Sequence, residues 1–182
     1  CLCFASVGVN SGRVDFVPPG RDCQPGSFPG CFRDSRNDQA YRAVSEILKP
    51  REFYELTGIM PDAINSVYQL YAASGCETWK NAGTFLFMPD FFCYLMTGTK
   101  ATEASIASTS QLLDRRTGEF HQGILARLGM DGLRLPEILK KPRVRGGFNS
   151  SFSEQTGYGQ FRVMNVNSHE TGTANPMAEA RP

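Results

Sequence analysis

The chain has 182 residues, of which 41% are hydrophobic and 20% charged, and its formal net charge is +1. These values are typical of a globular domain with a real core, and the lack of any long Lys or Arg block argues against a dedicated nucleic-acid surface. No apolar run approaches the roughly 18 residues that a membrane-spanning helix needs.

The first elements expected are two short strands, over residues 4–9 and 13–17, followed by a turn-rich connection over residues 18–30. From residue 37 the spacing becomes helical, with Tyr41, Val44 and Ile47 on one face, and Pro50 ends the run. A short helix over residues 53–58 then ends at a glycine C-cap, Gly58.

Further helices are expected over residues 64–75, 91–96 and 122–129, and Gly98 is expected to close the second of these. Residues 103–114 are predicted as a turn or short strand, and residues 131–138 as an irregular stretch. Residues 140–151 are predicted as a basic loop, residues 153–156 as a turn and residues 161–166 as a final strand. Strands at both ends with helices between them predict an α/β or α+β layer structure.

Metal-ligating residues are scattered along the chain. The six cysteines form no CxxC pair, and the only histidines are His121 and His169, which disfavours a structural zinc site. Reduced thiols and a cytoplasmic protein are expected from this cysteine usage. We expect His121 to be exposed without a partner, the basic stretch around Arg143 and Arg145 to be a solvated loop, and the aromatic residues from Phe85 to Tyr94 to be helix core.

The last predicted strand delivers His169 and Glu170 onto a turn rich in Ser, Thr and Gly. Active sites of open α/β sheets lie beyond the carboxyl ends of strands, where an acid can act as a general base toward a hydroxyl group. A carboxylate in this position is also compatible with a helix cap or a surface residue.

An ordered set of short motifs runs along most of the chain. They are Val14-Asp15-Phe16, Phe32-Arg33-Asp34-Ser35-Arg36, Tyr54-Glu55-Leu56-Thr57-Gly58-Ile59, Tyr68-Gln69-Leu70-Tyr71, Phe87-Met88-Pro89-Asp90-Phe91, Tyr94-Leu95-Met96-Thr97-Gly98, Ala107-Ser108-Thr109-Ser110-Gln111-Leu112-Leu113-Asp114 and His169-Glu170-Thr171. Together they resemble the amino-terminal domain of the FGGY carbohydrate kinases, from about Ser6 to Ala174.

This resemblance implies an α/β fold of the ribonuclease-H-like, actin-like ATPase type, with residues 1–175 a partial amino-terminal, sugar-binding lobe and 176–182 the start of the inter-lobe linker. It implies a sugar held in the cleft, ATP with Mg²⁺ as cofactor, and a carboxyl-terminal lobe that holds most of the nucleotide. Because the chain begins at Cys1 and stops soon after the His-Glu turn, we expect it to be a fragment without that lobe.

The resemblance also implies site residues. The segment from Gly8 to Val14 resembles the family's phosphate hairpin, but its distance from Arg36 favours the family's sugar-binding strand instead. Gly12 and Arg13 then lie where the family has Trp-Gly, close to the substrate. Glu170 takes the place of the family's catalytic Asp, which accepts the proton of the sugar's C1 hydroxyl as that oxygen attacks the γ-phosphate of ATP. His169 and Thr171 flank this base and contact sugar hydroxyls.

Four changes weaken the match at the site. Glu170 reaches about one methylene further than Asp, and Arg13 places a long cation where the family has a bare glycine backbone. Asn10 replaces an acidic residue, and Gly12 replaces a ring that could pack against the sugar. Two function classes therefore remain. The chain is part of a sugar kinase acting on a ketose, L-rhamnulose ahead of fuculose, xylulose or glycerol, or it is a catalytically dead sugar-binding or interaction module that kept the fold.

Overall fold

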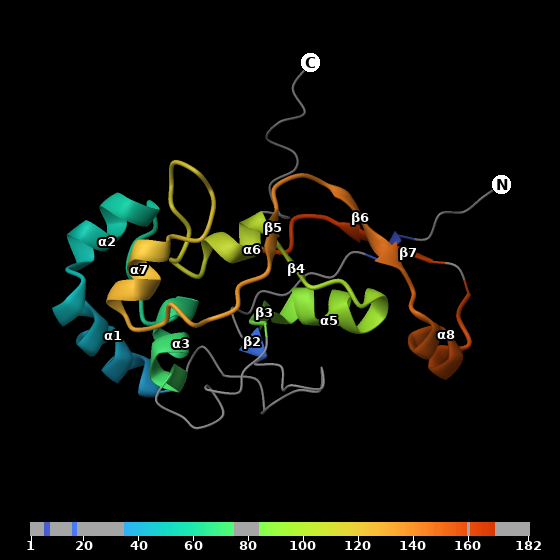
Figure 1. Cartoon of the computed structure of the whole chain (residues 1–182), viewed down its shortest axis with the longest axis horizontal. Coiled ribbons are helices and arrows are strands. Elements are labelled where there is room, and N and C mark those ends of the chain that lie inside the picture. The colour runs from blue at the N-terminus through green and yellow to red at the C-terminus, as the bar shows by residue number, and fades with distance from the viewer. Residues whose placement is uncertain (1–5, 8–15, 18–34, 75–83, 160, 170–182) are drawn as a thin grey trace, which may run out of the picture.

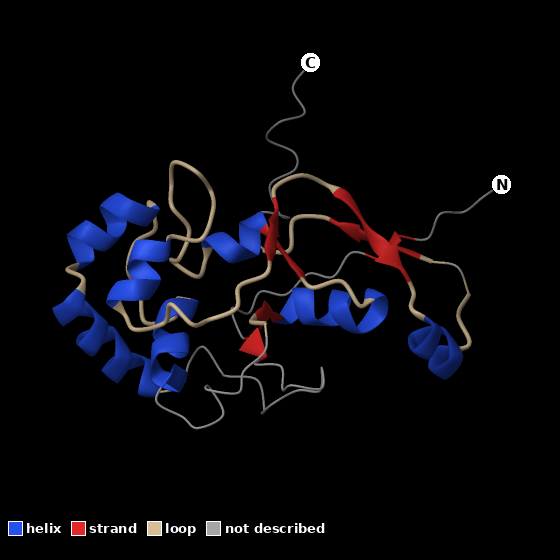
Figure 2. Ribbon diagram, viewed as in Figure 1, coloured by secondary structure: helices blue, strands red, loops and turns tan. Residues whose placement is uncertain are grey.

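The structure, a computed structural model, describes residues 6–7, 16–17, 35–74, 84–159 and 161–169. Helices and short strands alternate along this part of the chain (Figures 1 and 2). The helices are α1 Arg36–Ile47, α2 Pro50–Thr57, α3 Ser66–Ser74, α5 Met88–Thr97, α6 Ala104–Ser108, α7 Gln122–Arg127 and α8 Ser150–Thr156. The strands are β1 Ser6–Val7, β2 Phe16–Val17, β3 Leu86–Phe87, β4 Ala101–Glu103, β5 Glu137–Leu139, β6 Arg143–Gly147 and β7 Arg162–Asn165.

A helical body forms one end of the molecule, where α1, α2, α3 and α7 gather (Figure 1). The main core contains buried side chains from these helices, among them Val44, Phe53, Tyr68 and Ile124, together with residues of β3 and α6. Helix α1 ends at Ile47, before Pro50, as predicted. Pro50 also opens α2, three residues before the predicted start at residue 53, and its missing N–H costs no hydrogen bond there.

A three-stranded sheet lies at the other end, in the order β1-β7-β6. Strand β7 pairs in parallel with β1 and antiparallel with β6. A second apolar cluster packs α5 against this sheet through Cys93, Met96 and Val163, joined by Phe148 and Phe152. Helix α5 ends at Gly98, whose left-handed φ of 76° fits the predicted glycine cap.

Two pairs of short strands lie between these ends (Figure 2). Strand β2 pairs antiparallel with β3, which runs directly into α5, and β4 pairs in parallel with β5. Strand β4 in turn leads directly into α6. As a result, the amino-terminal end of α5 and the carboxyl-terminal end of β4 lie close to the sheet strand β7, through contacts described below.

Most helices agree with the sequence predictions, as does the final strand. Four predictions for the second half of the chain were wrong in part. Strand β5 overlaps the stretch predicted as irregular, and strand β6 lies within the predicted basic loop. Helix α8 includes the predicted turn, and helix α6 lies within the segment predicted as a turn or short strand. Strands β5 and β6 owe their structure to pairing with distant partners, which local composition does not reveal. The described parts of the first two predicted strands are Ser6–Val7 and Phe16–Val17.

The aromatic prediction was correct for burial but not for every residue. Phe85 and Phe87 are buried at or beside strand β3 rather than in a helix, while Phe92 on α5 is exposed. No helix within the described ranges is both long and apolar enough to cross a membrane.

Candidate functional site

The structure places one of the five predicted site residues. His169 is half-buried and follows the carboxyl end of β7 by four residues. Gly12, Arg13, Glu170 and Thr171 lie outside the described residues, and their roles stay predictions. What the structure does describe is how the chain is held immediately before Glu170.

Glu103, at the junction of β4 and α6, makes the first of the contacts that hold the chain before Glu170. Its backbone is extended, with φ −85° and ψ 140°, so its side chain folds over the first turn of α6. There the carboxylate accepts hydrogen bonds from the backbone N–H groups of Ser105, at 2.9 Å, and Ile106, at 3.3 Å. Glu103 therefore caps α6, satisfying two N–H groups that have no partner within the helix.

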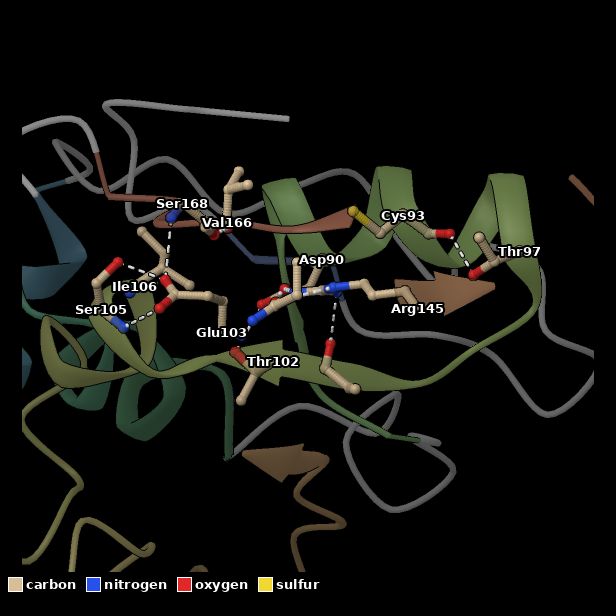
Figure 3. Close-up of polar contacts among 12 residues, drawn as sticks. Asp90, Cys93, Thr97, Thr102, Glu103, Ser105, Ile106, Arg145, Val166 and Ser168 are labelled. Atoms are coloured by element: carbon tan, nitrogen blue, oxygen red, sulfur yellow. Dashed lines mark hydrogen bonds and ion pairs between the residues drawn. The ribbon is translucent and has the colours of Figure 1, made fainter. Parts of the chain in front are cut away.

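The same carboxylate reaches the chain beyond β7 (Figure 3). It accepts the backbone N–H of Ser168 at 3.0 Å. The Ser105 hydroxyl donates a short hydrogen bond to Glu103 and accepts the backbone N–H of His169 at 3.2 Å. Two successive backbone N–H groups, those of Ser168 and His169, are thus bound by Glu103 at the end of β4 and by Ser105 in α6.

A buried ion pair lies next to this group along β4 (Figure 3). Arg145 on β6 donates to Asp90 in the first turn of α5 at 2.5 Å, and both side chains are essentially inaccessible to solvent. Asp90 also accepts the Thr102 hydroxyl at 2.5 Å and the Glu103 N–H at 3.3 Å. Burial raises the pKa of Asp90 to about 6, and the opposing attraction of the Arg145 guanidinium only partly offsets this.

Arg145 also binds the end of β7. Its guanidinium donates to the side-chain oxygen of Asn165 through two nitrogens, at 2.9 and 3.1 Å, and to the Ala101 carbonyl at 3.1 Å. Asn165 in turn donates to the Lys141 carbonyl at 3.2 Å. Since Asn165 is the last residue of β7, the segment from Asn165 to His169 is held at its start by Arg145 and near its end by Glu103.

The prediction of a solvated basic loop was wrong for Arg145. Strand β6 contains a bulge, because Val144 pairs with Met164 but Gly146 already pairs with Val163. The extra residue, Arg145, is thereby left out of the pairing and points into the protein. Its neighbour Arg143 behaves as predicted for a surface cation, in an exposed ion pair with Glu137 at 2.9 Å.

The prediction that His121 is exposed without a partner was also wrong. His121 precedes α7 and is partly buried, and its Nδ1 accepts the backbone N–H of Ile124 at 3.3 Å. Its Nε2 lies 3.9 Å from Asp114. The histidine therefore caps a helix, far along the chain from His169. Cys93, the cysteine that the structure describes, is buried, and this burial raises the pKa of its thiol.

Sequence reasoning missed the residues that support the turn. Asp90 appeared only within the motif Phe87-Met88-Pro89-Asp90-Phe91, with no role assigned to it. Glu103 gave no capping signal, because short side chains are preferred at that position. The available clue was Pro89-Asp90, a pair typical of a helix start. In the part of the chain that the structure describes, no group of three His, Cys, Asp or Glu residues could hold a metal ion.

Comparisons with known proteins place the chain in a family. Residues 30–166 match the family model "FGGY family of carbohydrate kinases, N-terminal domain". Similar curated proteins include the rhamnulokinases of Halalkalibacterium halodurans, 32% identical over 93% of this chain, and of Bacteroides thetaiotaomicron, 31% identical over 94%. In both cases the chain spans 36% of the relative's length.

Solved structures agree on the fold. A gluconate kinase and a ligand-bound xylulose kinase, both from Lactobacillus acidophilus, each superpose with a TM-score of 0.77 at 15% identity, over 91% of this chain and 34% of the other. A carbohydrate kinase from Novosphingobium aromaticivorans gives a TM-score of 0.75 at 19% identity. The expected fold, an amino-terminal lobe of the actin-like ATPase type, is therefore confirmed. This chain belongs to the FGGY family of carbohydrate kinases and matches the N-terminal domain of that family.

Proposed function

We propose that the chain forms the sugar-binding side of an ATP-dependent ketose kinase, with L-rhamnulose as the substrate and its 1-phosphate as the product. The proposal is supported by the rhamnulokinase relatives at about 30% identity. The observation that carries it is the doubly anchored segment after β7, which leads through His169 to Glu170. A sugar site needs hydroxyl-binding groups that are held in place before the ligand arrives.

In this proposal Glu170 removes the proton of the sugar's C1 hydroxyl, so that the oxygen becomes a nucleophile toward the phosphoryl donor. His169 and Thr171 bind neighbouring hydroxyls, and Gly12 and Arg13 approach the sugar from the strand near the amino terminus. ATP would supply the transferred phosphoryl group and leave as ADP, and bound Mg²⁺ would offset the charge on the phosphate oxygens. We assign no residue of this chain to the binding of ATP or Mg²⁺.

Calorimetric titration of the chain with L-rhamnulose, L-fuculose and D-xylulose, with and without Mg·ATP, tests the proposal. We expect saturable heat with L-rhamnulose and weaker binding of the other two sugars. A folded chain that gives no heat with any sugar would refute the sugar site.

A second candidate is a sugar-binding module without catalysis, which the Glu170 and Arg13 departures favour. Formation of a phosphorylated product distinguishes the two candidates. The kinase proposal expects that, once the chain is combined with the carboxyl-terminal lobe of a rhamnulokinase, Mg·ATP converts L-rhamnulose to a phosphorylated sugar. Binding without turnover in that assembly would favour the second candidate.

A further inference from the structure

Glu103 makes more contacts than a helix cap requires. Capping α6 uses the N–H groups of Ser105 and Ile106. The additional hydrogen bond, to the N–H of Ser168, links residues that are 65 positions apart in the sequence. Glu103 is also 5% exposed, so this contact lies in a largely water-excluded place where a charge-assisted hydrogen bond is strong.

The length of the Glu103 side chain matters for this second contact. Asp, Asn, Ser and Thr are the favoured capping residues because their short side chains reach the N–H groups of the next turn. Glu is longer by a methylene group than Asp. An Asp at position 103 would still cap α6, but its carboxylate would be drawn back toward the β4 backbone and away from Ser168.

Glu103 is itself held from the opposite side. Its backbone N–H donates to Asp90, which is fixed by the buried guanidinium of Arg145. Ser105 extends the contact by one residue, because its hydroxyl lies between the Glu103 carboxylate and the N–H of His169. A continuous set of polar contacts therefore runs from Asp90 on α5 through Glu103 to Ser168 (Figure 3). It is buried as far as Ser168 and partly buried where Ser105 meets His169.

We propose that Glu103 is a positioning residue for the candidate sugar site. Its carboxylate, together with the Ser105 hydroxyl, fixes the position of the backbone at Ser168 and His169, the two residues that precede Glu170. The part of this inference that concerns sugar binding rests on the proposed function. The part that concerns the turn does not.

Glu103→Asp separates capping from positioning, and Ser105→Ala removes the link to His169 while leaving the Glu103 carboxylate in place. The two histidines of the chain provide the readout, through the imidazole Cε1–Hε1 resonances in a carbon–proton correlation spectrum. His169 reports on the turn, while His121 in the cap of α7 serves as the internal control. Thermal unfolding monitors stability, and calorimetry with L-rhamnulose monitors the site.

We expect both variants to stay folded but to unfold at a somewhat lower temperature, because each loses a hydrogen bond to the Glu103 carboxylate. Both should shift the His169 resonance and leave that of His121 in place. Affinity for L-rhamnulose should fall about tenfold, as is typical when a hydrogen bond to a charged group is lost. An unshifted His169 in both variants would overturn the proposal, whatever the affinity. If the unaltered chain binds no sugar, the proposed function fails, while a His169 shift in the variants still supports the positioning role.

Discussion

Replacing Arg145 by Met should strongly destabilise the fold, because it leaves a charged carboxylate buried without its partner. The side chains of Arg145 and Asp90 are 1% and 0% exposed, so water cannot take the place of the guanidinium. The change also removes the donors that bind Asn165 and the Ala101 carbonyl. Breaking a buried pair in this way costs about 3–5 kcal/mol, which is a large part of the stability of an ordinary domain.

Arg143→Met is the matched control. Arg143 lies in the same strand, but its ion pair with Glu137 is exposed, with side chains 51% and 63% accessible. Such pairs contribute about 0–1 kcal/mol, so this variant should unfold close to the unaltered chain. The assay is urea unfolding followed by circular dichroism, with the midpoint and the slope fitted for each variant.

A double variant tests the cause of the loss. Adding Asp90→Asn to Arg145→Met removes the uncompensated charge, while the amide oxygen still accepts from Thr102 or the Glu103 N–H. We therefore expect the double variant to be more stable than Arg145→Met alone. The reasoning would be refuted if Arg145→Met and Arg143→Met had the same unfolding midpoint. It would also be refuted if adding Asp90→Asn to Arg145→Met lowered the unfolding midpoint further.

The remaining predictions concern pH and the bulge in β6. Because the folded-state pKa of Asp90 is raised above its usual value to about 6, its contribution to stability is present at low pH and is lost as the pH rises. Relative to Asp90→Asn, the unaltered chain should lose about 2 kcal/mol of unfolding free energy between pH 4 and 6.5, and a gain over this range would contradict the prediction. Gly146→Ala should cost about 1–2 kcal/mol, because φ is 156° and an added Cβ would lie 3.3 Å from Cβ of Thr97. Gly132→Ala, where no atom lies within 4 Å of an added Cβ, should be nearly neutral in the same unfolding assay, and equal costs would contradict the steric argument.

The parts of the fold that were predictable are those with local signals. Helices α1, α2 and α5 follow from apolar spacing and from residues that end helices, and Gly58 and Gly98 adopt the left-handed conformation expected of glycine caps. Strand β6 was not predictable, because Arg143–Gly147 is basic and rich in glycine and becomes a strand only by pairing with β7. The five-residue helix α6 is too short to show a periodic pattern.

The candidate site divides in the same way. The end of β7 was predictable, because an apolar strand followed by polar residues marks a strand end. The support from Glu103 and Arg145 was not, because it depends on contacts across 65 and 20 residues of sequence. The roles of Gly12, Arg13, Glu170 and Thr171, and the domain boundary at residue 175, stay predictions.

The central claim is that the turn carrying His169 binds a sugar, and a titration observed at the two histidines tests it most directly. L-Rhamnulose is added to the chain while the imidazole resonances are followed, with L-fuculose as the comparison. We predict a saturable shift of the His169 resonance and a stationary His121 resonance, since His121 is bound within the cap of α7. A His169 resonance that stays in place at saturating sugar, or moves only together with that of His121, would contradict the account.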